Sequence, residues 1–174
     1  MTLTKYIINE STKATRFSIS NIEVFIKDTI QDPEVSVSRV IKTVVSKIPS
    51  HLMRKVKQIH VGQFEFLNSK DYEASYQNSK IFVTNKQSSE EDMIDDIIHE
   101  VAHSVRDIGY PVLSVLTASI FHSPYAATSL SEYFADGFEA FYMKEELGRL
   151  KSISPRLYKK IIGLSTINTG DYND

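Results

Sequence analysis

Cysteine is absent from this chain of 174 residues. Its absence excludes structural disulfide bonds and every zinc site that is built on thiolates. Any zinc ion bound by the chain would therefore be held by histidine and carboxylate side chains. The chain has five histidines, which limits the candidates.

Positive charge is not in excess either, because 20 Lys and Arg stand against 22 Asp and Glu, for a formal net charge of -2. We therefore expect no binding to nucleic acid or to an anionic membrane surface. No stretch approaches the roughly 18 apolar residues of a membrane span. The first residues lack the apolar core and the cleavage site of a signal peptide. This pattern favours a cytoplasmic protein, while a secreted mature form that has lost its leader stays open.

The composition is that of an ordinary globular protein, with 41% hydrophobic and 24% charged residues, and it predicts a packed core. The length suggests one domain. We place this domain at residues 21–164, after an N-terminal arm or short strand at residues 1–20 and before a flexible tail at residues 165–174.

Hydrophobic periodicity predicts the order of the elements. The predicted helices cover residues 22–30, 37–48, 88–107, 112–121, 129–148 and 154–162, and the predicted strands cover residues 56–66 and 80–85. Ser88 or Ser89, each with an acidic residue three positions later, predicts a capping box at the start of the third helix. Two helices, two strands and then a run of helices indicate an α+β fold.

One segment of the third predicted helix, His99-Glu100-Val101-Ala102-His103, spells H-E-x-x-H. Residues four apart on a helix share a face, so the two imidazoles point the same way. This geometry suits two corners of a tetrahedral zinc site. Glu100 lies beside them, where a carboxylate can act as a general base on water.

A catalytic zinc site typically has three protein ligands, so a third ligand is needed. A metzincin-type site would need histidine six residues after His103, where this chain has Gly109. His122 is one alternative. The other candidates lie on the next predicted helix and are Glu132, Asp136 and Glu139.

We favour Glu132 as the third ligand, with Asp136 accepting the second N–H of His99 from one turn further along the helix. Two acidic residues on a strongly apolar helix need such partners, because a buried carboxylate is costly without one. Tyr125 lies seven residues before Glu132. Its hydroxyl could donate a hydrogen bond to the developing oxyanion, or its ring could simply cover the core.

The H-E-x-x-H motif and the acidic and aromatic motif that follows it resemble the two motifs of the gluzincin metallopeptidases. His99 to His103 is followed, after 28 intervening residues, by Glu132-Tyr133-Phe134-Ala135-Asp136-Gly137-Phe138. This is similar to the pattern H-E-x-x-H…E-[FY]-F-A-[ED]-x-F of the anthrax lethal factor catalytic domain and the clostridial Pro-Pro endopeptidases. The similarity spans roughly residues 38–164, although only the metal motifs are specific.

The resemblance implies a zincin-like fold, in which a small mixed sheet and the active-site helix lie above a C-terminal helical subdomain. It implies Zn²⁺ held by His99, His103 and Glu132, with Glu100 and Tyr125 as catalytic residues. One departure is Arg106, three residues after the second histidine, where these families commonly have aspartate. The proline-binding residues of the endopeptidases have no match here, so Pro-Pro specificity is not implied.

The sequence thus predicts a zinc metalloendopeptidase that acts on a peptide or protein substrate, and we expect a monomer. A non-catalytic zinc-binding module, regulatory or toxin-associated, is the alternative, and an enzyme acting on one intracellular protein is a third hypothesis. The predicted strand at residues 80–85 precedes the metal-binding helix. It could pair with extended substrate as an edge strand, or be a plain edge protected by Lys80 and Lys86.

Overall fold

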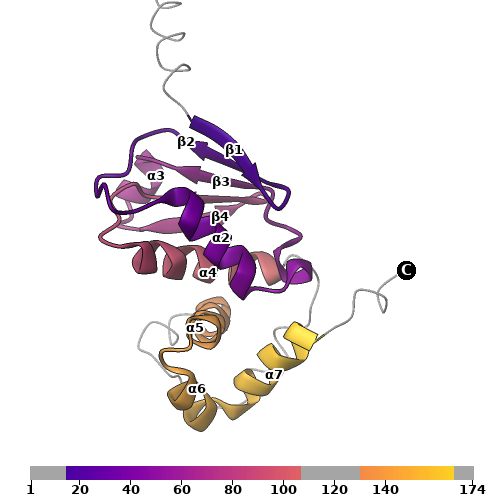
Figure 1. Ribbon diagram of the computed structural model, residues 1–174. Helices are drawn as coiled ribbons and strands as arrows, with labels where there is room; N and C mark the ends of the chain where they lie inside the picture. The colour runs from indigo at the N-terminus through magenta and orange to yellow at the C-terminus, as the bar shows by residue number, and fades with distance from the viewer. Residues whose placement is uncertain (1–14, 107–129, 167–174) are drawn as a thin grey trace, which may run out of the picture.

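The computed structural model describes residues 15–106 and 130–166, and it has an α+β fold, as predicted (Figure 1). Five strands form one sheet in the order β1-β2-β3-β5-β4. The three central strands are parallel, and the edge strands β1 and β4 are antiparallel to their neighbours. The strands are β1 (Thr15–Ile19), β2 (Ile22–Ile26), β3 (Gln58–Val61), β4 (Ala74–Gln77) and β5 (Lys80–Val83).

The helices form two groups around this sheet (Figure 1). α2 and α4 pack together beside it, and α5, α6 and α7 lie beyond α4. A 3-10 turn, η1 (Ser50–Met53), and a short helix, α3 (Glu65–Asn68), lie in the connections. The longer helices are α2 (Val37–Lys47), α4 (Glu90–Arg106), α5 (Leu130–Met143), α6 (Leu147–Ile153) and α7 (Pro155–Thr166).

The inner face of the sheet is aliphatic. Val24, Ile59 and Ile81 occupy one row across β2, β3 and β5, and each is fully buried. The apolar stripes of α2 and α4 cover this row. Each such side chain contributes about 1.5–3 kcal/mol by leaving water, so this packing fixes the position of α4 against the sheet.

The outer face of the sheet is aromatic. Phe25 stacks on His60, with ring centroids 4.7 Å apart, and His60 stacks on Phe82 at 5.1 Å. Phe64 and Phe66 close over Phe82 edge-on. Alternate residues of a strand point to opposite faces, so the same strands supply both the aliphatic core and this aromatic row.

The helix predicted over residues 22–30 is wrong, because residues 22–26 form β2. Ile22 and Val24 are buried while Glu23 and Phe25 are only partly so, which is the period of a strand. β1 pairs with β2 through a tight turn at Ser20 and Asn21, both of which have positive φ. Residues 15–19 of the predicted arm therefore belong to the sheet.

Other boundaries also differ from the prediction, and one helix was missed. The strand predicted over 56–66 ends at Val61, and Phe66 lies in α3. The helix predicted over 129–148 ends at Met143, because Lys144 takes a positive φ of 72° that no helix can continue through. Gly148 lies instead in α6, which was not predicted.

Strand β5 is not an edge strand, contrary to one hypothesis for residues 80–85. It lies between β3 and β4, and the edge next to α4 is β4, which was not predicted. The predicted helices at α2, α4 and α7 are confirmed. At the start of α4 the Asp92 N–H donates to Ser89 Oγ at 3.0 Å, which confirms the Ser89 cap. The helix predicted over 112–121 lies outside the described residues.

Candidate metal centre

Helix α4 presents His99 and His103 on one face, as their spacing predicts. Between and beside them Ile98, Val101 and Ala102 are buried in the core, so the helix cannot rotate without exposing them. The two imidazole centroids lie 5.1 Å apart. The aliphatic core thus determines where both imidazoles point.

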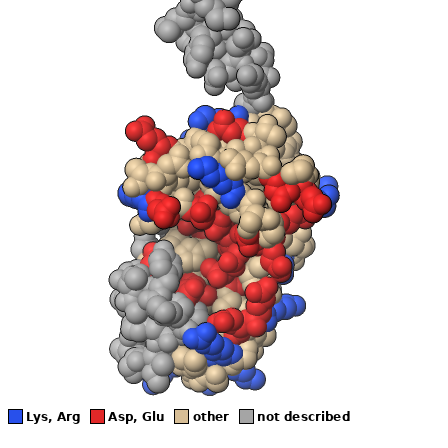
Figure 2. Space-filling model, turned by 90° about the vertical axis from the view of Figure 1, so that its left-hand side faces the viewer, with Lys and Arg blue, Asp and Glu red and all other residues tan. Residues whose placement is uncertain are grey.

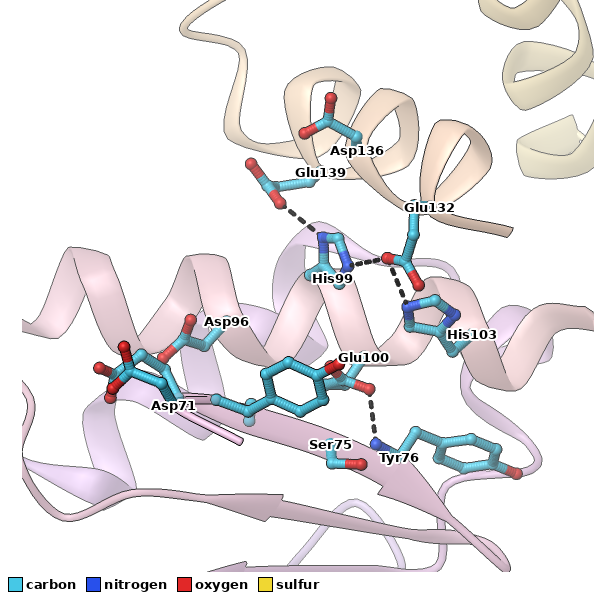
Figure 3. A pocket seen from close by; sticks show the side chains of 13 residues that line it. Asp71, Ser75, Tyr76, Asp96, His99, Glu100, His103, Glu132, Asp136 and Glu139 are labelled. Atoms are coloured by element: carbon cyan, nitrogen blue, oxygen red, sulfur yellow. Dashed lines mark hydrogen bonds and ion pairs between the residues drawn. The ribbon is translucent and has the colours of Figure 1, made fainter. Parts of the chain in front are cut away.

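Helix α5 brings Glu132 to the two imidazoles (Figure 3). Glu132 Oε2 lies 3.2 Å from His99 Nε2 and 3.4 Å from His103 Nε2. Around a tetrahedral zinc ion with bonds of 2.0–2.1 Å, ligand atoms lie about 3.3 Å apart. The two distances from Glu132 Oε2 are therefore those expected if it shares a metal ion with each imidazole.

The other nitrogen of each imidazole already has a protein partner. His99 Nδ1 donates to Glu139 Oε2 at 2.9 Å, and His103 Nδ1 lies 3.0 Å from Ser131 Oγ. A ligating imidazole commonly donates its second N–H in this way, which fixes the tautomer and the ring orientation. Both Nε2 atoms are thereby directed at the same point.

Glu100 lies on the adjacent side of α4, against the sheet. Its side chain is nearly buried, at 8% exposed, and its Oε2 accepts the main-chain N–H of Tyr76 at 2.5 Å. Burial raises the pKa of Glu100 to about 7, against the opposing effects of His99 and of the Tyr76 N–H. Ligand atoms of His99, Glu100 and His103 lie within 4.8 Å of one another, so this group could hold a metal ion.

The pKa of His99 is also shifted. Burial lowers it, but the hydrogen bonds to Glu132 and Glu139, together with the charge of Glu100, outweigh burial and raise it to about 10. An environment that stabilises a positive charge on His99 this strongly is also one that stabilises a bound cation.

These residues line a cleft of about 570 Å³. One wall, which we call the sheet wall, is formed by α4, β4 and the residues just before β4. The other, the helix wall, is formed by Glu132, Asp136 and Glu139 of α5. Asp71, Glu73 and Asp96 add further carboxylates. Figure 2 shows acidic side chains gathered in a band on one face of the molecule.

Burial in this cleft raises the pKa of Asp96 to about 6, although its hydrogen bond to Gln87 opposes the shift. The pKa of neighbouring Asp95 rises to about 7, first through burial and then through the charge of Glu139. The charges of Glu73 and Glu139 add to the effect of burial on the pKa of Asp96 and of Asp95 respectively, and a bound cation would offset this repulsion.

Four of the predicted site residues meet as expected, namely His99, Glu100, His103 and Glu132. Asp136 lines the cleft, and the Nδ1 contact to His99 that we expected of it is made by Glu139. Tyr125 and His122 lie outside the described residues.

Sequence reasoning missed the parts played by Glu139, Ser131 and the Tyr76 main chain. Glu139 could have been found, because residues at i, i+4 and i+7 share one helix face and it lies seven residues after Glu132. Tyr76 could not, because its contact comes through a main-chain group of a strand that the pattern did not reveal.

Comparison with known proteins returned no matching family model, curated protein or solved structure. Among the described residues, no helix combines the length and the apolar character that crossing a membrane requires.

Proposed function

We propose that this protein is a zinc-dependent metalloendopeptidase. The observation that carries the proposal is the convergence of His99 Nε2, His103 Nε2 and Glu132 Oε2 at distances of 3.2 and 3.4 Å from the carboxylate oxygen. Two histidines and one carboxylate form a common ligand set of catalytic zinc, which leaves a fourth position open. With no cysteine in the chain, this is also the ligand chemistry that the sequence permits.

The reaction we propose is hydrolysis of a peptide bond. When bound, zinc supplies Lewis-acid activation of water and of the peptide carbonyl. Glu100 takes a proton from the attacking water and later passes it to the leaving amine. Burial raises the pKa of Glu100, which makes its carboxylate a stronger base than an exposed one. Tyr125 remains the predicted oxyanion donor.

A base beside the ligand set separates this proposal from a purely structural zinc site. Glu100 is nearly buried and lies next to His99 in the chain, where its carboxylate faces the cleft between the two walls. The cleft beside it is lined by Ala74, Ser75 and Tyr76 of β4, which among the described residues is an edge strand of the kind to which extended peptides add. Both features support a peptide as the substrate.

The test joins metal analysis to peptide cleavage. The purified chain is expected to bind about one zinc ion and, when loaded, to cleave members of a random peptide pool, as followed by mass spectrometry. Glu100→Gln should slow cleavage by about 10²–10⁴-fold while keeping the zinc. Glu65→Gln, which changes an exposed carboxylate of α3, is the matched control and should cleave like the parent.

Three outcomes would count against the proposal. Zinc well below one ion per chain would remove the site, and full activity in Glu100→Gln would remove the mechanism. Zinc binding with no cleavage of any peptide would favour the non-catalytic zinc-binding module.

A further inference from the structure

The β4 edge of the sheet lies directly beside the candidate base. Within residues 15–106 and 130–166, β4 is the last strand of the sheet, and its neighbours are β5 on one side and α4 with the cleft on the other. Ala74, Ser75 and Tyr76 all line the cleft. An extended peptide lying in the cleft would therefore run along β4.

The pairing of β4 shows which of its main-chain groups point to that edge. In an antiparallel ladder, residues that bond the neighbouring strand alternate with residues whose N–H and C=O point away. Thr84 N–H donates to the Glu73 carbonyl at 2.8 Å, so Glu73 and Ser75 bond towards β5. The N–H groups of Ala74 and Tyr76 therefore point to the edge.

At this edge the Glu100 side chain makes a hydrogen bond that an added strand would otherwise make. Its Oε2 accepts the Tyr76 N–H at 2.5 Å, as the carbonyl of a paired strand would (Figure 3). A hydrogen bond to a carboxylate is short and roughly twice as strong as one between neutral groups. A peptide that adds to β4 at Tyr76 needs the same N–H.

Resting on the proposed function, we propose that Tyr76 N–H is a specificity-determining group which Glu100 and the substrate use in turn. A carbonyl oxygen of an extended peptide replaces the Glu100 carboxylate as the acceptor of Tyr76 N–H. The released carboxylate then turns towards the attacking water. Glu100 is thus held on β4 until a peptide backbone fills the edge.

This exchange selects the class of substrate. A peptide long enough to pair with Tyr76 releases the base, whereas a dipeptide or a small amide that reaches only the metal-binding residues leaves Glu100 bound to β4. The site would therefore cut extended, unfolded segments of a chain and spare small amides.

The experiment measures peptide binding rather than cleavage. Glu100→Gln keeps an oxygen that can accept Tyr76 N–H, whereas Glu100→Ala removes the acceptor. With a random pool of short peptides as the probe, Glu100→Ala should retain bound peptides about tenfold more tightly than Glu100→Gln, the effect of one competing hydrogen bond. The measurement is made with zinc and again with a chelator present.

Two variants of Tyr76 provide the control. Tyr76→Pro removes the N–H, and proline is tolerated on an edge strand where the N–H points away from the paired strand, here β5. Tyr76→Ala removes the same side chain but keeps the N–H. The difference between Glu100→Ala and Glu100→Gln should persist in the Tyr76→Ala background and vanish in the Tyr76→Pro background.

A second measurement serves if Tyr76→Pro does not fold. Hydrogen exchange of the Tyr76 amide should be faster in Glu100→Ala than in the parent, and bound peptide should slow it again. Equal peptide retention by Glu100→Ala and Glu100→Gln would overturn the exchange. So would peptide binding that leaves the Tyr76 amide unprotected, since Glu100 would then be fixed on β4 for its orientation alone. Cleavage by the zinc-loaded parent can persist in both cases, so the proposed function is judged separately.

Discussion

The sheet wall and the helix wall of the cleft are held in place by different means. The sheet wall carries His99, Glu100 and His103 on α4. This helix packs on the aliphatic inner face of the five-stranded sheet. The helix wall carries Glu132 on α5, which is supported from behind by α6 and α7. Among the described elements, the main contacts of α5 are with the helices α4, α6 and α7.

This difference determines what each wall contributes to the site. The spacing of the two histidines is determined within α4, so it does not change when α4 and α5 shift slightly relative to each other. The position of Glu132 depends instead on how α5 packs against α4, so the distance from this proposed third ligand to the two imidazoles is sensitive to the packing of the helix wall. Variants of the helix wall should therefore alter metal affinity and leave the sheet intact.

The largest expected effect is the loss of Glu132. Glu132→Ala should weaken zinc binding by more than about 100-fold, because even partners outside the ligand set commonly cost 10–100-fold. Affinity is measured by competition with a chromophoric chelator. Asp136→Ala, on the same helix and lining the same cleft, is the matched control and should lose much less. A greater loss in Asp136→Ala would move the third ligand to Asp136.

The next largest loss of zinc affinity is expected from the hydrogen-bond partners of His99 Nδ1 and His103 Nδ1. Glu139→Ala removes the carboxylate 2.9 Å from His99 and should weaken zinc binding by about 10–100-fold. Ser131→Ala removes only a neutral hydroxyl 3.0 Å from His103 and should have a smaller effect. Glu139→Gln, which can still accept the N–H, should recover part of the loss. Equal affinities for Glu139→Ala and the parent would show that His99 needs no such support.

A third variant tests the packing behind the helix wall. Gly137 of α5 lies so close to α7 that an added Cβ would overlap Leu157 Cδ2, and Leu157 is buried. Gly137→Ala should destabilise the protein by about 1–3 kcal/mol through overpacking. Gly163→Ala on α7 has open space around it and should instead stabilise by up to about 1 kcal/mol. Both are measured by denaturant unfolding.

Leu157→Ala provides the check on the cause. In that background the overlap is gone, so Gly137→Ala should cost little or nothing, since residues in direct contact show strong coupling. If Gly137→Ala costs the same with and without Leu157, the loss has another origin and the close approach of α5 to α7 is not what holds the helix wall.

The same division between the walls explains what the sequence could predict. The H-E-x-x-H geometry is local, because a helix of known period relates His99 to His103. The Ser89 cap and the start of α7 at Pro155 are local for the same reason. Glu132 could be predicted as a site residue from the helical pattern around it and from the resemblance of its motif to the gluzincin pattern.

Features that depend on the pairing of distant segments could not be predicted from the sequence. Residues 22–26 carry apolar side chains at helical spacing, yet β2 forms because it pairs with β1 and β3. β4 has a weak pattern of its own and exists through its pairing with β5. The Tyr76 N–H therefore became visible as a partner of Glu100 only once the edge of the sheet was known.

The smallest expected effect tests whether the sheet is independent of the metal centre. His60 lies within the aromatic row on the outer face of the sheet, between Phe25 and Phe82. Burial, and then the charge of Lys80, lower the pKa of His60 from its usual value of 6.5. The folded protein therefore binds this proton more weakly than the unfolded chain does, and stability is lost as pH falls below about 6.5.

His60→Phe keeps an aromatic ring in the row and removes the proton. Above pH 7 the free energies of unfolding of parent and variant should differ by a constant amount, and as pH falls through 6.5 the difference should shift in favour of the variant. Unfolding is followed at a series of pH values with a chelator present. A difference that stays constant across the whole range would mean that His60 binds its proton equally in both states. Repeating the series with zinc should give the same shift, because the aromatic row shares no residue with the cleft. A shift that appears only with zinc would contradict the independence of the aromatic row from the metal centre.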